Sequence, residues 1–424
     1  MVAAAPVTAM RPVYLCLAAL AAFGFYWLSS FILAERWATL NFGADAHLYT
    51  MIAKGEVLDR ILRFHPVTVW MAVAWMAALK PLTAWLAPHS VLKALFAVIG
   101  AAGVLATVPA FSKLVPRGVG VLFALIYALS FGVWYFASIE ESKIVTATLS
   151  ALYIAIYLHL RDRWTMRGAV LLTAVLLLAC LNEIVSGFLI VIPVVDTLMR
   201  HGGDWREAGW RAADWRADLW LVPHALAGPL ALAILEFAVN RQLPQAADAE
   251  GASHLSMLFY YIFKSDHGVA SLYGFLVNWL FFNIAAPTPT APYMITPPYG
   301  GYFEPSLASY FSAPASACAA ILLGVILLAS LWRGREPLPH DKTSLLVGLL
   351  AYSAVRGAFF FIFNPSEPML FSPAVTLAHL LVIAMLFMAS AFPAKRVVLA
   401  AFALALLAAN GAFMVGPWPP PSPV

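Results

Sequence analysis

Residues 140–167 read EESKIVTATLSALYIAIYLHLRDRWTMR, and this stretch decides the fold class. Its central part, 144–160, holds no Asp, Glu, Lys or Arg, while glutamates precede it and arginines follow it. A helix needs roughly 20 mostly apolar residues to cross about 30 Å of hydrocarbon, and in lipid a helix satisfies its own backbone hydrogen bonds. The stretch therefore predicts a membrane-spanning helix with one acidic and one basic end.

The composition extends this interpretation to the whole chain. Of the 424 residues, 62% are hydrophobic and only 11% are charged, and the mean hydropathy is +0.84, which excludes a water-soluble globule. The three cysteines, Cys16, Cys180 and Cys318, lie within or beside apolar segments, so neither a disulfide framework nor a zinc spacing is present. The net charge of +4 is small, and the basic residues stand in short loops. Such residues are more typical of loops that set the orientation of membrane helices than of a nucleic-acid-binding surface.

Short loops rich in arginine and lysine mark the cytoplasmic side of a membrane protein. We place the loops 161–167 and 200–216 there, and 112–117 with them. Two full spans between 66 and 111 would place the loops 112–117 and 161–167 on the outside. The segment 66–86, whose apolar stretch is broken by Lys80-Pro81, is therefore expected to be a juxtamembrane or re-entrant helix.

The predicted fold is an all-α polytopic membrane protein with about eleven transmembrane helices and its N-terminus inside. The expected spans are roughly 12–34, 91–111, 118–137, 144–160, 168–181, 184–199, 217–239, 313–332, 344–363, 370–391 and 396–415. The first is too long for a signal-peptide core and is expected to stay as an anchor. The external segments are 35–90 and 240–312, and the latter contains an apolar piece, 268–286, that is either interfacial or part of an extra hairpin.

The few acidic residues fall at the ends of apolar runs, and this topology gathers Asp45, Glu140, Glu141, Glu183 and Glu367 on the non-cytoplasmic side. Carboxylates collected at one face of a helical bundle suggest a site. For the adjacent glutamates the alternative is a helix cap, and for Glu183 it is simple helix termination. A charge at that depth needs a partner or water.

Cations accompany these carboxylates. The first external loop holds Arg63 and His65 shortly after Asp45, which suits an acid or base beside an anion; the alternative is an interfacial helix with solvated charges. Arg356 lies inside an apolar span and needs a carboxylate or phosphate partner, unless it snorkels or forms a structural ion pair.

The arrangement of Asp45, the helix expected over 46–62, His65-Pro66 and Glu140-Glu141 resembles the GT-C superfamily of integral-membrane glycosyltransferases. The protein O-mannosyltransferase and aminoarabinose-transferase group is the most similar. The resemblance covers roughly residues 10–200 and is one of pattern. It departs from the group where Ala46-His47 follows Asp45 in place of a second acid, and where Val67-Thr68 follows His65-Pro66 in place of a second proline and a leucine.

The resemblance implies an inverting hexosyl- or pentosyltransferase that uses a polyprenyl-phosphate sugar. Asp45, with Glu140 or Glu141, would be catalytic. The cations expected to stabilise the leaving phosphate are Arg63, His65, Lys80 and Arg356. The residues expected to bind substrate are His47, Tyr49, Glu183, Asn364 and Glu367.

The same resemblance implies three regions: a catalytic transmembrane module over 1–239 with the loop 35–90, an external loop over 240–312, and C-terminal transmembrane helices over 313–424. The partners would be the donor, membrane lipid and a glycan, lipid or protein acceptor, without nucleic acid. No metal-ligand spacing is diagnostic, so a divalent cation beside Glu140 or Glu141 is left open. The expected location is a bacterial inner membrane, with the site facing the periplasm.

Two other classes compete with this interpretation. A transporter or lipid flippase would place ionisable residues near the midplane and show related halves with broken helices. This sequence shows no internal repeat, and its carboxylates lie at helix ends. A non-catalytic scaffold or inactive relative is the third class, and substitution of Asp45 distinguishes it.

Overall fold

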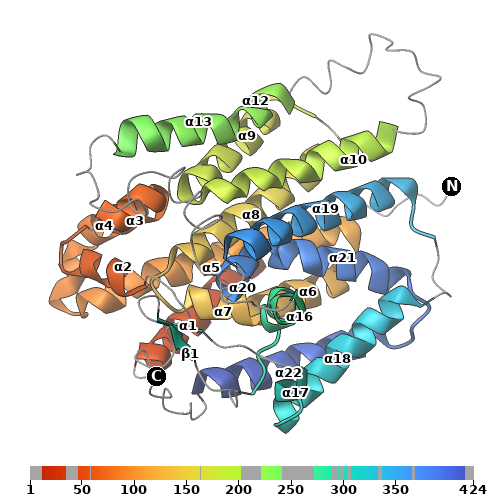
Figure 1. Ribbon diagram of the computed structural model, residues 1–424. Coiled ribbons are helices and arrows are strands. Elements are labelled where there is room, and N and C mark those ends of the chain that lie inside the picture. Colours follow the sequence, from red (N-terminus) through yellow and green to blue (C-terminus); the bar gives the residue numbers. More distant parts are fainter. Residues whose placement is uncertain are drawn as a thin grey trace.

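The fold is a bundle of long apolar helices (Figure 1). The computed structural model describes residues 12–34, 46–57, 59–162, 164–201, 221–240, 272–288, 294–296, 300–302, 307–332, 337–364 and 368–415. Asp45 and Glu367 lie outside the described residues, and so does the side chain of His47.

The elements follow one another in three groups. The first is α1 (Pro12–Ala34), α2 (Ala46–Ala53), α3 (Asp59–Phe64), α4 (Pro66–Ala78), η2 (Lys80–Ala84), α5 (Pro88–Leu114), α6 (Arg117–Leu129), α7 (Phe131–Ala137) and α8 (Ser142–Leu160). The second is α9 (Met166–Asn182), η3 (Ile184–Ile190), α10 (Val191–His201), α12 (Leu221–Ala225), α13 (Ala227–Ile234), η4 (Leu235–Val239), α16 (Leu272–Leu276) and η6 (Val277–Phe282). The third is the antiparallel strand pair β1 (Met294–Thr296) and β2 (Gly300–Tyr302), then α17 (Leu307–Tyr310), α18 (Pro314–Leu331), α19 (His340–Phe363), α20 (Pro368–Phe371), η7 (Ser372–Val375), α21 (Thr376–Ala389) and α22 (Lys395–Val415).

Seven helices in the described part of the chain are long and apolar enough to cross a membrane. They are α1, α5, α8, α18, α19, the run from α20 to α21, and α22. The bent pair α6 and α7 makes an eighth if it is one span. The other three spans expected from the sequence coincide with α9, with η3 and α10, and with the run from α12 to η4, which are shorter or interrupted helices. The chain is thus an all-α protein with several helices that fit a multi-pass membrane protein. Of the eleven expected spans, seven or eight correspond to described helices that are long and apolar enough to cross a membrane.

The bundle has two chemically different ends. At the basic end, Lys113 of α5 pairs with Asp162 after α8 at 2.8 Å, and Lys342 of α19 donates to the Leu114 carbonyl at 3.0 Å. The acidic end contains Glu140, Glu141 and Glu183. Because α8 has 19 residues and rises about 1.5 Å per residue, the two ends lie roughly 28 Å apart.

The helix α4 lies along the acidic end. His65, just before it, contacts the carbonyl of Asn182 at the end of α9, and Trp75, in its last turn, donates to the Val91 carbonyl at the start of α5. Both ends of α4 therefore meet the same end of the bundle, where α2, α3 and α4 are grouped in Figure 1. With 13 residues, α4 is also shorter than a span requires.

The helices α6 and α7 meet at a 58° bend, and the segment 272–288 fills the break. At the start of α7, the Phe131 and Gly132 amides donate to the carbonyls of Ile284 and Asn283 at 3.0 and 2.9 Å. Trp279 and Phe282 of η6 are buried. The sequence left 268–286 as an interfacial piece or a hairpin arm. Its described part buries one face in the bundle, while Leu272, Tyr273 and Leu276 on the other face are exposed. Broken backbone is stable at such depth only when neighbouring groups satisfy it.

Candidate functional site

A buried ion cluster lies at the acidic end, centred on Glu183. Its Oε1 atom is 3.3 Å from Lys143 Nζ, and its Oε2 atom accepts a short hydrogen bond from Arg356 Nη2. The three side chains are 7%, 8% and 1% exposed, so water screens them little. Burial raises the pKa of the Glu183 carboxyl, but the charges of Arg356 and Lys143 outweigh it and hold that pKa well below its usual range.

Each cation of the cluster also covers an aromatic ring. Lys143 Nζ lies 4.7 Å from the centroid of the Phe371 ring, and the Arg356 guanidinium lies 5.0 Å from that of Phe360. The two rings stack on each other at 4.0 Å and 11°. Cation–π contacts strengthen when water is excluded, so this stack helps to hold both cations in place around Glu183.

Arg356 keeps donors that the described residues do not use. Its Nε and Nη1 atoms are buried and donate no hydrogen bond within the described part of the chain. Buried polar groups without a partner are uncommon in native proteins and often mark a place for a ligand, ion or water. The arginine sits seven residues before the end of α19, about 10 Å along the helix.

Asn182 fastens three elements together beside this cluster. Its side-chain oxygen accepts from the Thr68 amide and hydroxyl at 3.1 and 2.6 Å, its amide group donates to Thr146 Oγ1 at 3.0 Å, and its carbonyl contacts His65 Nδ1 at 2.6 Å. His65 lies close enough to Glu183 to favour the charged form of that carboxyl. The start of α4 is therefore held next to the ion cluster.

The two adjacent glutamates have different roles. Glu141 caps α8, because its Oε1 atom accepts from both the amide and the hydroxyl of Ser142 at 2.8 Å. Glu140 is 2% exposed, and its Oε1 atom accepts no hydrogen bond from the described residues. Burial raises the pKa of the Glu140 carboxyl to about 7, against the opposing charge of Lys93. Of the pair, Glu140 has the properties of a proton acceptor near neutral pH.

An apolar cavity of about 390 Å³ is lined by chain neighbours of Glu183 and Arg356, and none of the three cluster residues is among its lining residues. Its walls include Ile184, which follows Glu183 directly, and Phe359 and Phe363, which lie within two turns of Arg356 on α19. Phe188 and the buried His224 also line it. The volume falls in the range of about 300 to 1,000 Å³ that is usual for ligand sites.

The structure brings together only part of the predicted set. Glu183, Arg356 and His65 meet in the ion cluster, with Glu140 and Glu141 at the same end. The exposed Lys80 follows α4 while His65 precedes it, so a 13-residue helix of about 20 Å separates them. Lys80 therefore cannot share a phosphate with His65, contrary to the set expected from the sequence.

Of three further predicted residues, Tyr49 has another visible role, Asn364 lies farther along α19, and Arg63 is only seen to be buried. Tyr49 is fully buried and packs its ring against Phe96 at 6.3 Å, as a core residue does. Arg63 is buried in α3, and Asn364 ends α19, eight residues or about 12 Å beyond Arg356. Asp45, Glu367 and the side chain of His47 lie outside the described residues. Among those that are described, no group of three His, Cys, Asp or Glu side chains could hold a metal ion.

Sequence reasoning missed three residues of this region: Lys143, Asn182 and Lys93. Lys143 follows Glu140 and Glu141 closely, and Asn182 precedes Glu183, so both stand in clusters that the sequence made visible. Both could have been found from the sequence, because a charged or amide side chain in an apolar segment is energetically unfavourable unless it has a partner. Lys93 carries no such signal, because it stands in the first turns of α5, near the water boundary.

No protein-family model matches the sequence, and no curated protein is significantly similar to it.

Proposed function

We propose that this chain is an inverting glycosyltransferase of GT-C type, which moves a sugar from a polyprenyl-phosphate donor to an acceptor on the non-cytoplasmic face of a membrane. One observation carries the proposal: the buried cluster of Lys143, Glu183 and Arg356 leaves two donors of the arginine unused among the described residues, and chain neighbours of Glu183 and Arg356 line an apolar cavity. A lipid phosphate has a negative charge that the unused arginine donors can bind and an isoprenoid chain that an apolar cavity can hold.

The chemistry needs one proton acceptor and one anion-binding group. The acceptor hydroxyl oxygen would attack the anomeric carbon and lose its proton to a carboxylate, while the bond from that carbon to the phosphate oxygen breaks. Polyprenyl phosphate leaves, and Arg356, Lys143 and His65 would stabilise its charge. Asp45 is the base that the family resemblance implies. Glu140, whose buried Oε1 atom accepts no hydrogen bond from the described residues, supports a second carboxyl at the same end.

The proposal is tested by incubating the purified full chain with a panel of radiolabelled polyprenyl-phosphate sugars and acceptors. Labelled product and released lipid phosphate are scored together. We expect transfer from one donor, and a loss of about 100-fold or more in Asp45→Asn and in Glu140→Gln, since a general base typically contributes 10² to 10⁴ in rate. Glu56→Gln, an exposed glutamate near the same end, is the matched control. Undiminished transfer by Asp45→Asn would remove Asp45 from the mechanism.

A transporter or flippase for an anionic isoprenoid lipid is the second candidate. The 58° bend between α6 and α7 and the buried Glu183–Arg356 pair favour it, since transporters use broken helices and intramembrane charge. Reconstitution into vesicles separates the two functions. Movement of a labelled lipid-phosphate sugar across the bilayer, with the sugar still attached, supports the transporter, whereas release of free lipid phosphate supports the transferase.

A further inference from the structure

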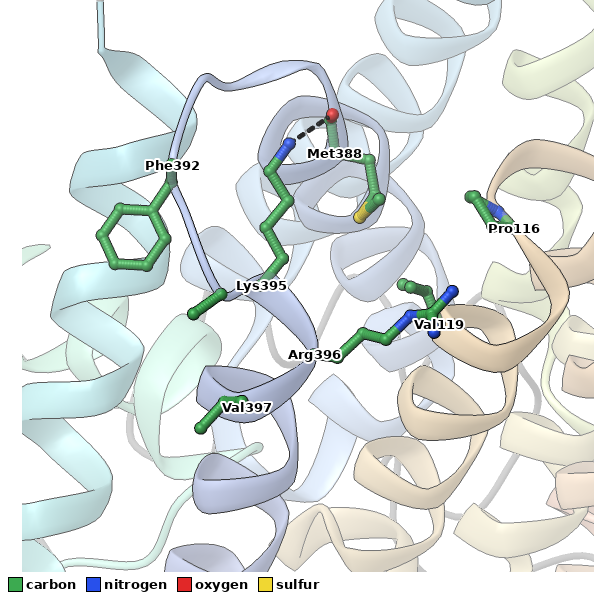
Figure 2. Close-up of a pocket in the computed structure, with 8 residues that line it drawn as sticks. Pro116, Val119, Met388, Phe392, Lys395, Arg396 and Val397 are labelled. Carbon is green, nitrogen blue, oxygen red and sulfur yellow. Dashed lines mark hydrogen bonds between the residues drawn. The ribbon is translucent and has the colours of Figure 1, made fainter.

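A second cavity lies at the basic end of the bundle, far from the ion cluster. It has a volume of about 360 Å³ and opens between the first turn of α6 and the turn that joins α21 to α22. Its apolar walls come from Val119, Met388, Phe392 and Val397, and its cationic side chains are Lys395 and Arg396 (Figure 2). Nothing in the proposed sugar transfer uses this cavity.

The turn beside the cavity has a fixed shape. Lys395 Nζ donates to the Met388 carbonyl at 2.8 Å and to the carbonyl of Ser390, which closes the turn on the last carbonyls of α21. Ala394 has φ = 55°, a left-handed conformation that is uncommon for a residue other than glycine. The Ala394 carbonyl accepts hydrogen bonds from the Val397 and Val398 amides at 2.9 and 3.1 Å, so this turn leads directly into α22.

The side chains that line the cavity carry positive charge and no negative charge. Arg396 is exposed, extends from α22 toward the first turn of α6 in Figure 2, and makes no ion pair or hydrogen bond with the residues that the structure describes. None of the residues lining the cavity is acidic, and Arg117 lies between two of them, Pro116 and Val119. An anion is therefore the complementary ligand.

The position selects the kind of anion. Both α6 and α22 begin at the cavity, and α22 is one of the helices fit to cross a membrane, so the cavity lies where lipid head groups meet water. We infer that the cavity binds an anionic glycerophospholipid, with the phosphate on Arg396 and the first acyl methylenes on the apolar walls. Basic pockets between transmembrane helices recognise such head groups in this way.

The test compares lipid retention by the full-length protein in native mass spectrometry. The protein is released from micelles that contain either phosphatidylglycerol or phosphatidylcholine at equal mole fraction. We expect phosphatidylglycerol to be retained in preference, and Arg396→Gln to weaken its binding about five-fold, the effect of one basic residue near a membrane surface. Arg167→Gln, which removes an exposed arginine at the basic end, should leave retention unchanged.

A second variant tests the cavity itself. Met388→Trp fills the space without a change of charge and is expected to reduce phosphatidylglycerol retention as well, while a thermal melt checks that each variant is folded. Equal retention of the two lipids, an equal loss in Arg167→Gln, unchanged binding in Met388→Trp, or displacement by millimolar inorganic phosphate would each overturn the inference.

Discussion

Replacement of Glu183 by glutamine removes the carboxylate that pairs with two buried cations. Lys143 and Arg356 would keep their charges at 8% and 1% exposure. Breaking a buried ion pair on one side costs about 3 to 5 kcal/mol, and since glutamine keeps the volume and one acceptor oxygen, we expect about 3 kcal/mol. That loss corresponds to roughly a 150-fold change in the unfolding equilibrium.

The measurement is equilibrium unfolding of the purified protein in mixed micelles of increasing denaturing detergent, with Glu56→Gln as the exposed control. The triple variant Lys143→Met, Glu183→Met, Arg356→Met should regain stability to within about 1 kcal/mol of the wild type, because replacing a whole buried ion cluster by apolar groups is often neutral. The same variant should no longer bind the lipid-phosphate donor. A free energy of unfolding for Glu183→Gln within 0.5 kcal/mol of the wild type would refute the reasoning.

Three more predictions concern other parts of the chain. The pKa of Glu140 rises from 4.5 to about 7 on folding, so unfolding between these pH values releases a proton. The free energy of unfolding of the wild type should therefore fall as pH rises from about 4.5 to 7. Glu140→Gln should make this pH dependence weaker. Asp196→Asn should cost about 3 to 5 kcal/mol, since this fully buried carboxylate pairs with Arg161 at 2.6 Å. Gly103→Ala should cost about 1 to 3 kcal/mol, because its Cβ would lie 2.7 Å from Thr148 Oγ1, where α5 packs on α8.

Each of these has its own check. Melting temperatures between pH 4.5 and 8 test Glu140, and an unchanged slope in the glutamine variant would assign the pH dependence to other groups. For Asp196, the control is Asp162→Asn, a 54%-exposed partner of Lys113 that should cost less than about 1 kcal/mol. For Gly103, the control is Gly24→Ala, where a Cβ meets nothing within 4 Å. Equal losses in variant and control would contradict either prediction.

The sequence by itself determined that this is an all-helical protein fit for a membrane, and where most long helices run. The expected ranges 12–34 and 144–160 agree with α1 and α8 within two residues. The thickness of the hydrocarbon layer sets the length of a membrane-spanning helix, and an uninterrupted apolar run of that length is visible in the sequence. The same rule is weaker for the interrupted regions from 184 to 199 and 217 to 239, where short helices with breaks replace the continuous spans expected.

The tertiary structure alone decided which charges meet. A sequence shows that Glu183 and Arg356 both need partners, but 173 residues separate them, and only the packing of α9, α8 and α19 pairs them and adds Lys143. The tertiary structure also distinguished Glu140 from Glu141. Glu141 accepts a hydrogen bond from the Ser142 amide at the start of α8, whereas Glu140 has a buried Oε1 atom with no hydrogen-bond partner among the described residues. Pairing energy depends on distance and burial, and neither is written in the order of residues along the chain.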